Sequence, residues 1–305
     1  MLSCPECKST ELQRRGFNHR KDGSDIQRYM CMQCRSWFSE DDATEVQQVS
    51  KARIAILDVE TLPSKGYVWG FWEQNIAQSQ VIQEGCLLSW GIKLLNSSDT
   101  VGDVLTPKEA LKYDFKRITK DLWNAMKDID IFIGHNYLDF DRKVINTAFL
   151  LADLPPLKYK VIDTLKTARE QFKFGSNKMA YINSRLGIRN KISNEGFELW
   201  RRCAEGDVKA LDEMLSYNLG DLFATEELYY KVRPYIFNHP DLSLYNTLET
   251  KQCPNCLSTD LKVEGYYPPT AKSRYESVRC NNCGALHRLN VNTLTKEKRK
   301  NLLSR

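Results

Sequence analysis

The stretch at residues 54–61 constrains the fold most, because it places two acidic side chains at the end of an apolar, β-branched run. Its sequence is IAILDVET, which is typical of a strand buried on both faces. Side chains alternate along a strand, so Asp58 and Glu60 are expected on one face. Two carboxylates this close repel each other and resist desolvation unless a cation lies between them. The stretch therefore predicts either a Mg²⁺ or Mn²⁺ site or a strand that simply ends in two solvated acids.

Two C-x-x-C pairs occur at each end of the chain, and in both cases 23 residues separate the pairs. Aligning the two ends at a constant offset also matches Pro5 with Pro254 and Gly16 with Gly265. This agreement indicates an internal duplication that flanks a central domain. The cysteines are Cys4, Cys7, Cys31 and Cys34 at one end, and Cys253, Cys256, Cys280 and Cys283 at the other.

Four thiolates in two such pairs fit a tetrahedral Zn²⁺ site. Modules this small have little core of their own, so metal binding is expected to contribute much of their folding free energy. Two disulfides per module, or redox-active pairs, are the alternatives, and the absence of a secretion signal disfavours disulfides. We therefore expect two structural Zn²⁺ ions, one in a zinc ribbon at residues 1–40 and one in a ribbon at residues 250–290.

Aromatic and basic side chains alternate in both ribbons, for example at Arg28, Tyr29 and Trp37, and at Tyr266 and Arg274. Such side chains can stack on bases and neutralise phosphates. Nucleic-acid contact, protein docking and structural capping all remain open as roles for the ribbons.

Residues 51–245 alternate between strand-like and helix-like patterns, which favours an α/β domain. Strands are expected at 86–95, 100–105, 129–133 and 160–162, with Cys86 as a buried thiol. Helices are expected at 107–127, 142–152, 178–186, 196–203 and 207–232, and Asp163 is expected to cap the helix that follows it.

Two segments lack such patterns. Residues 41–50 are polar and are interpreted as a linker, whereas an aromatic stretch is expected to pack as a flap over the core. The aromatic residues are Tyr67, Trp69, Phe71 and Trp72.

Two further groups of polar residues follow the acidic strand in the sequence. Asn136, Phe140 and Asp141 follow the strand at 129–133, and Tyr217 and Asp221 lie four apart, hence on one face of the last long helix. Taken alone, Asp141 would be interpreted as a helix cap and Asp221 as a solvated boundary residue.

Together, Asp58 and Glu60, the N-x-x-x-F-D group and the Y-x-x-x-D group resemble the three exonuclease motifs of the tyrosine branch of the DEDD superfamily. The wider sequence over residues 53–245 is similar to the proofreading domain of family B DNA polymerases, and more closely to the stand-alone 3′–5′ exonucleases of phages and bacteria. The segments that carry this similarity include VWGFWEQNI, VIDTLKTA and MLSYNLGDLFAT. The resemblance implies a ribonuclease-H-like fold, a mixed five-stranded sheet with helices on both faces.

The resemblance also implies the site. Asp58 would bridge two Mg²⁺ or Mn²⁺ ions, Glu60 and Asp221 would complete the first, and Asp141 would hold the second. Tyr217 would orient the attacking water. Among softer assignments, substrate contacts would come from Thr61, Leu62, Asn136 and Phe140. We interpret His135 as structural, and the motif spacing favours Asp141 over Asp139.

The expected function is therefore two-metal hydrolysis of single-stranded DNA from the 3′ end to nucleoside 5′-monophosphates, in DNA replication or processing. An exoribonuclease and a catalytically inactive nucleic-acid-binding or replisome adaptor are the alternatives. Single-stranded DNA 3′ ends and a DNA polymerase or another replication protein are the expected partners, with no membrane. No signal peptide or membrane span is evident, so we expect a cytoplasmic protein of a bacterial or phage-infected cell.

The distribution of charge agrees with a polyanionic substrate. Residues 1–38 carry seven basic and four acidic side chains, residues 251–288 carry six and three, and residues 289–305 carry five and one. Residues 291–305 are interpreted as a basic tail. Because the net charge of the chain is +5, residues 39–250 carry a net −5. An acidic core with basic ends suits an enzyme that holds cations and gathers nucleic acid, although such asymmetry also occurs for solubility alone.

Overall fold

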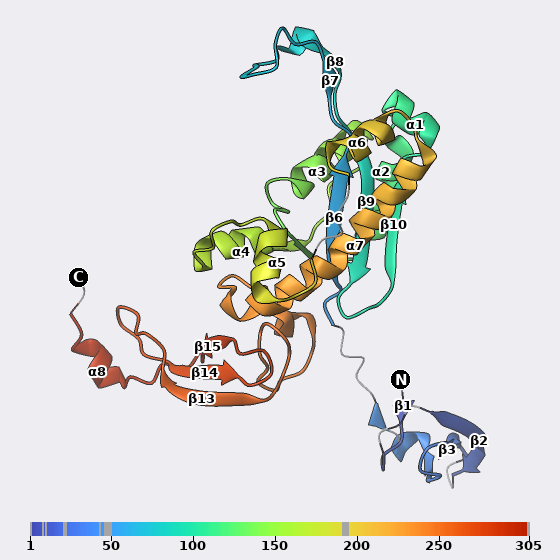
Figure 1. The fold of residues 1–305 in the computed structure, drawn as a ribbon. Coiled ribbons are helices and arrows are strands. Elements are labelled where there is room, and N and C mark those ends of the chain that lie inside the picture. Colours follow the sequence, from blue (N-terminus) through green and yellow to red (C-terminus); the bar gives the residue numbers. More distant parts are fainter. Residues whose placement is uncertain are drawn as a thin grey trace. The chain divides into compact units, whose positions relative to one another are not determined.

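A computed structural model describes residues 2–7, 9, 11–20, 23–42, 44–45, 51–190 and 195–303. The chain forms two compact units, which are drawn in Figure 1. One contains residues 1–50 and 246–248, and the other contains residues 51–245 and 249–305. Among the described residues, no helix combines the length and apolarity that crossing a membrane requires.

The larger unit is built on a five-stranded sheet whose central strand is β6 (Ile54–Thr61), the acidic strand. β6 pairs in the antiparallel sense with β9 (Leu87–Leu94) and in the parallel sense with β11 (Ile131–Gly134). The antiparallel β10 (Thr100–Val104) and the parallel β12 (Lys160–Asp163) form the edges. The sheet is therefore mixed, and its most protected strand carries the two acids.

Helices cover both faces of this sheet. On one face, Ile56 of β6 shares a buried cluster with Leu222 of α7 (Val208–Val232). On the other, Leu57 shares a cluster with residues of α2 (Lys116–Met126) and α3 (Asp141–Leu151). Because side chains alternate along β6, Asp58 and Glu60 lie on the face that α7 covers. The buried Lys93 of β9 fixes α7 further, since its Nζ lies 2.6 Å from Glu226 Oε2.

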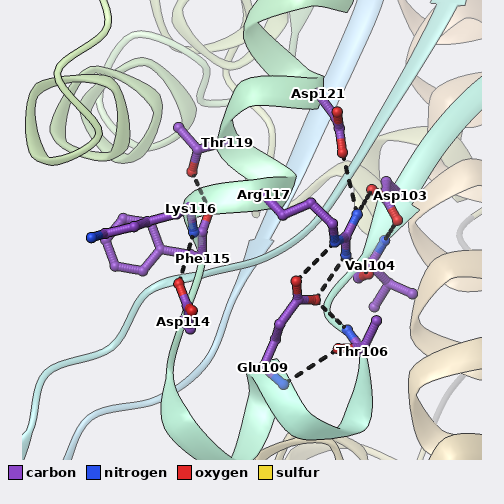
Figure 2. A network of polar contacts seen from close by, with 10 residues as sticks. All are labelled: Asp103, Val104, Thr106, Glu109, Asp114, Phe115, Lys116, Arg117, Thr119 and Asp121. Carbon is purple, nitrogen blue, oxygen red and sulfur yellow. Dashed lines mark hydrogen bonds and ion pairs between the residues drawn. The ribbon is translucent and has the colours of Figure 1, made fainter.

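The helix expected at 107–127 is in fact two helices, α1 (Pro107–Lys112) and α2. The break falls at Tyr113, which adopts the left-handed conformation with φ of 53°. Figure 2 shows how Arg117 ties the broken segment together: its guanidinium contacts Asp103 of β10, Glu109 of α1 and Asp121 of α2. Thr106 and Glu109 cap α1 reciprocally. The apolar period continues across the break, which is why the sequence pattern did not reveal it.

The remaining helices of the core lie beside α7. Buried residues of α4 (Thr164–Gln171) and α5 (Met179–Leu186) share a third cluster with α7. α6 (Phe197–Ala204) packs against the amino-terminal half of α7. Two 3₁₀ helices follow α7, η3 (Arg233–Tyr235) and η4 (Leu242–Tyr245). The prediction that Asp163 caps a helix is confirmed, because its side chain accepts hydrogen bonds from Leu165 N and Lys166 N at the start of α4.

The aromatic stretch after β6 does not pack over the core, so the expectation of a packed flap is wrong. It forms the tip of a hairpin between β7 (Lys65–Gly66) and β8 (Val81–Gln83), with η2 (Gln78–Gln80) before β8 (Figure 1). Trp69 is 96% exposed and Phe71 is 94% exposed. Aromatic composition alone cannot distinguish a buried side chain from an exposed one.

Each ribbon contains a three-stranded antiparallel sheet. The strands are β2 (Leu12–His19), β3 (Asp25–Cys31) and β4 (Trp37–Ser39) in the first, and β13 (Leu261–Tyr266), β14 (Glu276–Cys280) and β15 (Leu286–Arg288) in the second. Both first strands carry a bulge at equivalent glycines, Gly16 with φ of 79° and Gly265 with φ of 70°. The duplication seen in the sequence therefore extends to backbone geometry.

Short elements complete both units. β1 (Leu2–Ser3) pairs with β5 (Thr44–Glu45), and η1 (Glu40–Asp42) follows β4. Of the stretch interpreted as a linker, residues 43 and 46–50 lie outside the described residues. α8 (Lys296–Lys300) lies in the basic tail, whose residues 304–305 also lie outside the described residues.

The second ribbon is hydrogen-bonded to the core. Leu242 N donates to Pro254 O over 2.8 Å, and Asn255 Nδ2 donates to Arg233 O over 3.2 Å.

Candidate active site and metal centres

The structure brings together three of the acids that the sequence singled out. Asp58 and Glu60 project from β6 toward α7, and Asp221 projects from α7 toward β6, so that one carboxylate oxygen of each lies within 4.8 Å of the others. Asp221 is fully buried, and the other two are half-buried. Carboxylate oxygens are the ligands that Mg²⁺ and Mn²⁺ prefer. The donor set therefore fits a hard divalent cation, which would relieve the repulsion among three converging charges.

Asn218, which the sequence reasoning did not single out, contacts this group directly. Its Nδ2 donates to Asp58 Oδ2 over 2.7 Å, and its side chain is buried. Gly91 of β9, the partner of Asp58 in the sheet, makes room for it, because a Cβ at that position would lie 3.1 Å from Asn218 Oδ1. The signal available in the sequence was an amide three residues before Asp221, on the same helix face.

Asp141 lies at the first turn of α3, but it does not cap that helix. Its Oδ1 accepts a hydrogen bond from Val59 N, on β6 between the two acids, over 3.0 Å. Burial raises the pKa of Asp141 well above its ordinary value, and the charge of Asp58 raises it further. Asp141 is not within the 4.8 Å group of the other three acids. Its carboxyl is thus next to the same strand and electrostatically coupled to Asp58.

Tyr217 lies one turn before Asp221 on α7 and is half-buried. Its ring packs edge-on against Trp200 of α6, with the ring centroids 6.1 Å apart. This contact between helices restricts the rotation of the ring. The position of the phenol is therefore set by helix packing rather than by a flexible loop.

Three of the four residues expected to contact substrate line one cavity of about 780 Å³. Thr61 and Leu62 enter it from the end of β6, where the pairing with β9 shifts register after Glu60, and Phe140 enters it from the start of α3. Asn136 lies elsewhere, in a cavity of about 370 Å³. Its backbone is left-handed, with φ of 73°, and its N–H donates to Asp163 Oδ1.

The neighbours of the second motif have structural partners. His135 Nδ1 lies 2.9 Å from Thr164 Oγ1, and its Nε2 lies 3.1 Å from Asn177 O. Asp139 is exposed and pairs with Lys143 at 3.3 Å. Asp139 is therefore held at the surface, whereas Asp141 is hydrogen-bonded to β6.

The cysteines form two clusters, each with its four Sγ atoms within 4.8 Å of one another. None of the ten cysteines, all among the described residues, forms a disulfide. In the second cluster Cys253 Sγ lies 3.6 Å from Cys283 Sγ, and Cys256 Sγ lies 3.6 Å from Cys280 Sγ. Sulfur atoms around a tetrahedral Zn²⁺ lie about 3.8 Å apart, given Zn–S bonds of about 2.3 Å. Both clusters could therefore hold such an ion.

His287 adds a contact that the cysteine spacing did not predict. Its Nε2 lies 3.4 Å from Cys253 Sγ in the second cluster. The equivalent position in the first ribbon is Phe38. Each cluster consists of four cysteines, but the groups around the two clusters differ, and such neighbouring groups commonly tune metal affinity.

The sheet order and the helices on both faces define the class of fold, an α/β ribonuclease-H-like fold, as expected from the sequence. The family model of the RNase H superfamily matches residues 96–233, a region that contains Asp141, Tyr217 and Asp221 and excludes β6.

Among solved structures, the chain is similar to the family B DNA polymerase from the hyperthermophilic archaeon Pyrobaculum calidifontis. The identity is 11% and the TM-score is 0.41, over 73% of this chain and 29% of the polymerase chain. The chain thus corresponds to less than a third of that polymerase's length. No curated protein matches it.

Proposed function

We propose that the chain is a metal-dependent 3′–5′ exonuclease that hydrolyses single-stranded DNA to nucleoside 5′-monophosphates. One observation carries the proposal: Asp58, Glu60 and Asp221 converge from a central strand and the helix that covers it. Such a cluster destabilises a protein that has no use for it, because each carboxylate loses solvation and repels the others. A divalent cation offsets both costs.

Four carboxylates would hold the metal ions. Asp58, Glu60 and Asp221 would hold one ion, and Asp58 together with Asp141 would hold the second. Bound there, two Mg²⁺ or Mn²⁺ ions would lower the pKa of the attacking water and stabilise the leaving 3′ oxygen. Asn218 keeps Asp58 in position by its hydrogen bond to Oδ2.

The other residues would position the reactants. The Tyr217 hydroxyl, one turn from Asp221, would orient the attacking water and assist its deprotonation. Thr61, Leu62 and Phe140, which share one cavity, would hold the terminal nucleotide through apolar contacts. In the reaction, a bond forms between the water oxygen and phosphorus, the bond from phosphorus to the 3′ oxygen breaks, and the 3′ oxygen takes up a proton.

The two cysteine clusters would each hold one structural Zn²⁺. The spacing of their sulfur atoms and the absence of disulfides support this assignment. Zinc would stabilise sheets whose own apolar core is small, as in the first ribbon, where the buried cluster contains only Cys4, Tyr29, Cys31 and Phe38 among described residues.

The proposal is tested by single-turnover digestion of matched single-stranded DNA and RNA oligonucleotides, labelled at the 5′ end, with Mg²⁺, with Mn²⁺ and with EDTA. We expect a metal-dependent ladder on DNA, and we expect Asp58→Ala and Asp221→Ala to remove nearly all cleavage while the chain stays folded. Faster cleavage of RNA would identify an exoribonuclease instead. Binding of DNA without any cleavage would identify an adaptor, and full activity in either variant would refute the site.

A further inference from the structure

A second concave surface lies where the second ribbon meets the core, away from the acids. We call it the ribbon groove: a cavity of about 650 Å³ between the segment that follows α7, including Tyr235 and Phe237, and the ribbon residues Arg279, Leu286 and Arg288. The hydrogen bonds from Asn255 to Arg233 O and from Leu242 to Pro254 O hold its two walls together. The groove is therefore part of the larger unit's fold.

The charge of the groove is one-sided. The charged residues of its lining are two arginines, Arg279 and Arg288, and the lining contains no Asp or Glu. The cavity beside Thr61, in contrast, is lined by one lysine and one glutamate. Arg279 pairs at its rim with Glu264, with 2.8 Å between Nε and Oε2, which leaves Arg288 as the more available cation. A groove of this kind favours an anionic occupant.

The groove also presents flat apolar groups to solvent. Phe237 is 78% exposed and Tyr235 is 54% exposed, and the guanidinium of Arg288 lies 4.4 Å from the ring centre of Tyr275. Exposed aromatic rings beside arginines suit stacked bases and phosphates together. An acidic peptide would match the charge, but it would leave the exposed rings without flat partners.

Smaller cavities link the groove with Asn136 of the second motif. A small cavity shares Tyr235 and Phe237 with the groove, and it shares Leu138 and Lys166 with the cavity that contains Asn136. Along this path the charges are mixed, since the cavity that contains Asn136 is lined by three basic and three acidic residues, and Lys166 lies 3.9 Å from Glu170. The side chain of Asp163 accepts hydrogen bonds from four backbone N–H groups. We call this series of neighbouring cavities, from Asn136 to the second ribbon, the track.

We propose that the ribbon groove binds the single-stranded nucleic acid several nucleotides before its 3′ end, by stacking on Phe237 and pairing with Arg288. This inference rests on the proposed exonuclease function, because it assigns the track to that enzyme's substrate. The second ribbon then acts as a clamp on the strand, and long substrates gain affinity that short ones lack.

The test compares a double variant, Phe237→Ala with Arg288→Ala, with a matched control, Phe197→Ala with Arg185→Ala. Phe197 is 70% exposed on α6 and Arg185 is exposed on α5, and neither lines the groove. Binding of a fluorescent single-stranded oligonucleotide long enough to reach the groove is measured by anisotropy in EDTA without cleavage. Hydrolysis of a dinucleotide is measured separately with Mn²⁺. If the double variant loses zinc or unfolds, the single variant Phe237→Ala replaces it in both assays.

We expect the double variant to bind the long oligonucleotide about tenfold more weakly. The slope of the logarithm of the binding constant against the logarithm of the salt concentration should become shallower by about 0.7, the contribution of one phosphate contact. The double variant's rate on the dinucleotide should be unchanged, and the control should match the wild type in both assays. Unchanged oligonucleotide affinity, an equal loss in the control, or binding of an acidic peptide in place of DNA would overturn the proposal. If the wild type shows no cleavage, and the groove variant still binds the oligonucleotide more weakly, the proposed exonuclease function is wrong. The assignment of the groove as a nucleic-acid-binding site is then still supported.

Discussion

Asn218 Nδ2 donates a hydrogen bond of 2.7 Å to Asp58 Oδ2, joining the covering helix α7 to the central strand β6. The same helix turn carries Asp221, so one element supplies both a candidate ligand and the group that orients another. The Asn218 side chain is buried, so the position of Asp58 depends on the packing of α7.

Replacing Asn218 tests that dependence. We expect Asn218→Ala to weaken the apparent Mn²⁺ affinity about 10- to 100-fold, because a carboxylate ligand loses the hydrogen bond that orients it. A Mn²⁺ titration of cleavage rate measures the effect. Ser216→Ala, an exposed change on the same helix, is the control. Equal metal affinity in the wild type and Asn218→Ala would show that the hydrogen bond has no part in metal binding.

Asp141 and Asp139, which lie two positions apart, allow two acids of one segment to be compared. Asp141→Asn should lower the cleavage rate at least about 100-fold, because it removes a ligand charge beside Asp58, whereas Asp139→Asn should leave the rate within about twofold. The amide retains an oxygen that can accept from Val59 N, so both variants should melt within a few degrees of the wild type. A larger loss in Asp139→Asn than in Asp141→Asn would reverse the assignment.

The duplicated ribbons differ at one strained position. Arg35 has φ of 63°, and its counterpart in the second ribbon is Gly284, with φ of 80°. A left-handed conformation disfavours arginine and suits glycine. Arg35→Gly should stabilise the first ribbon by about 0.5–1 kcal/mol, and Gly284→Ala should destabilise the second by a similar amount.

Zinc competition with a chelator on the full chain measures both changes. Each substitution should alter the affinity of one cluster by about two- to fivefold and leave the other cluster as an internal control. Identical competition curves for the wild type and both variants would contradict the structural equivalence of Arg35 and Gly284.

His239 gives the larger unit a specific sensitivity to acid. Its Nε2 lies 2.9 Å from the Tyr229 hydroxyl, and its burial lowers the pKa of the imidazole from 6.5 to about 4. Between these values the unfolded chain binds a proton that the folded chain does not. The stabilisation is therefore complete above pH 6.5 and is lost as the pH falls toward 4.

From pH 7 to pH 5, this group should lower the free energy of unfolding by about 2 kcal/mol. His239→Gln removes the titration, so its urea unfolding midpoint should fall less over that interval than that of the wild type. The wild type and His239→Gln carry the same cysteine clusters. Any loss of metal at low pH therefore affects both proteins equally and cancels when their midpoints are compared. Parallel losses in the two chains would rule out His239 as the source.

Local periodicity predicted part of this structure well. The alternation of residues 54–61 placed Asp58 and Glu60 on one face, and the helical period placed Tyr217 and Asp221 on another. The face of β6 and the face of α7 meet through contacts between residues about 160 positions apart in the sequence. Periodicity cannot show such contacts. The sequence indicated that meeting only through resemblance to known exonuclease motifs.

The failures have equally physical causes. Tyr113 breaks a helix because one residue adopts a left-handed conformation, while the apolar pattern continues on both sides. Trp69 and Phe71 were expected to pack as a flap over the core, because composition does not show whether an aromatic side chain is buried or exposed. Asn218 and His287 were missed because an isolated amide or imidazole acquires a role only from the groups that the fold brings to it.

The direction of digestion tests the central claim most directly. Two samples of one single-stranded DNA, labelled at the 3′ or the 5′ end, are digested with Mn²⁺ in a single turnover. If the chain is a 3′–5′ exonuclease, the 3′ label is released first as a mononucleotide, while the 5′ label remains in a shortening ladder. Early release of the 5′ label as a mononucleotide, or internal cleavage with both labels in long fragments, would contradict it.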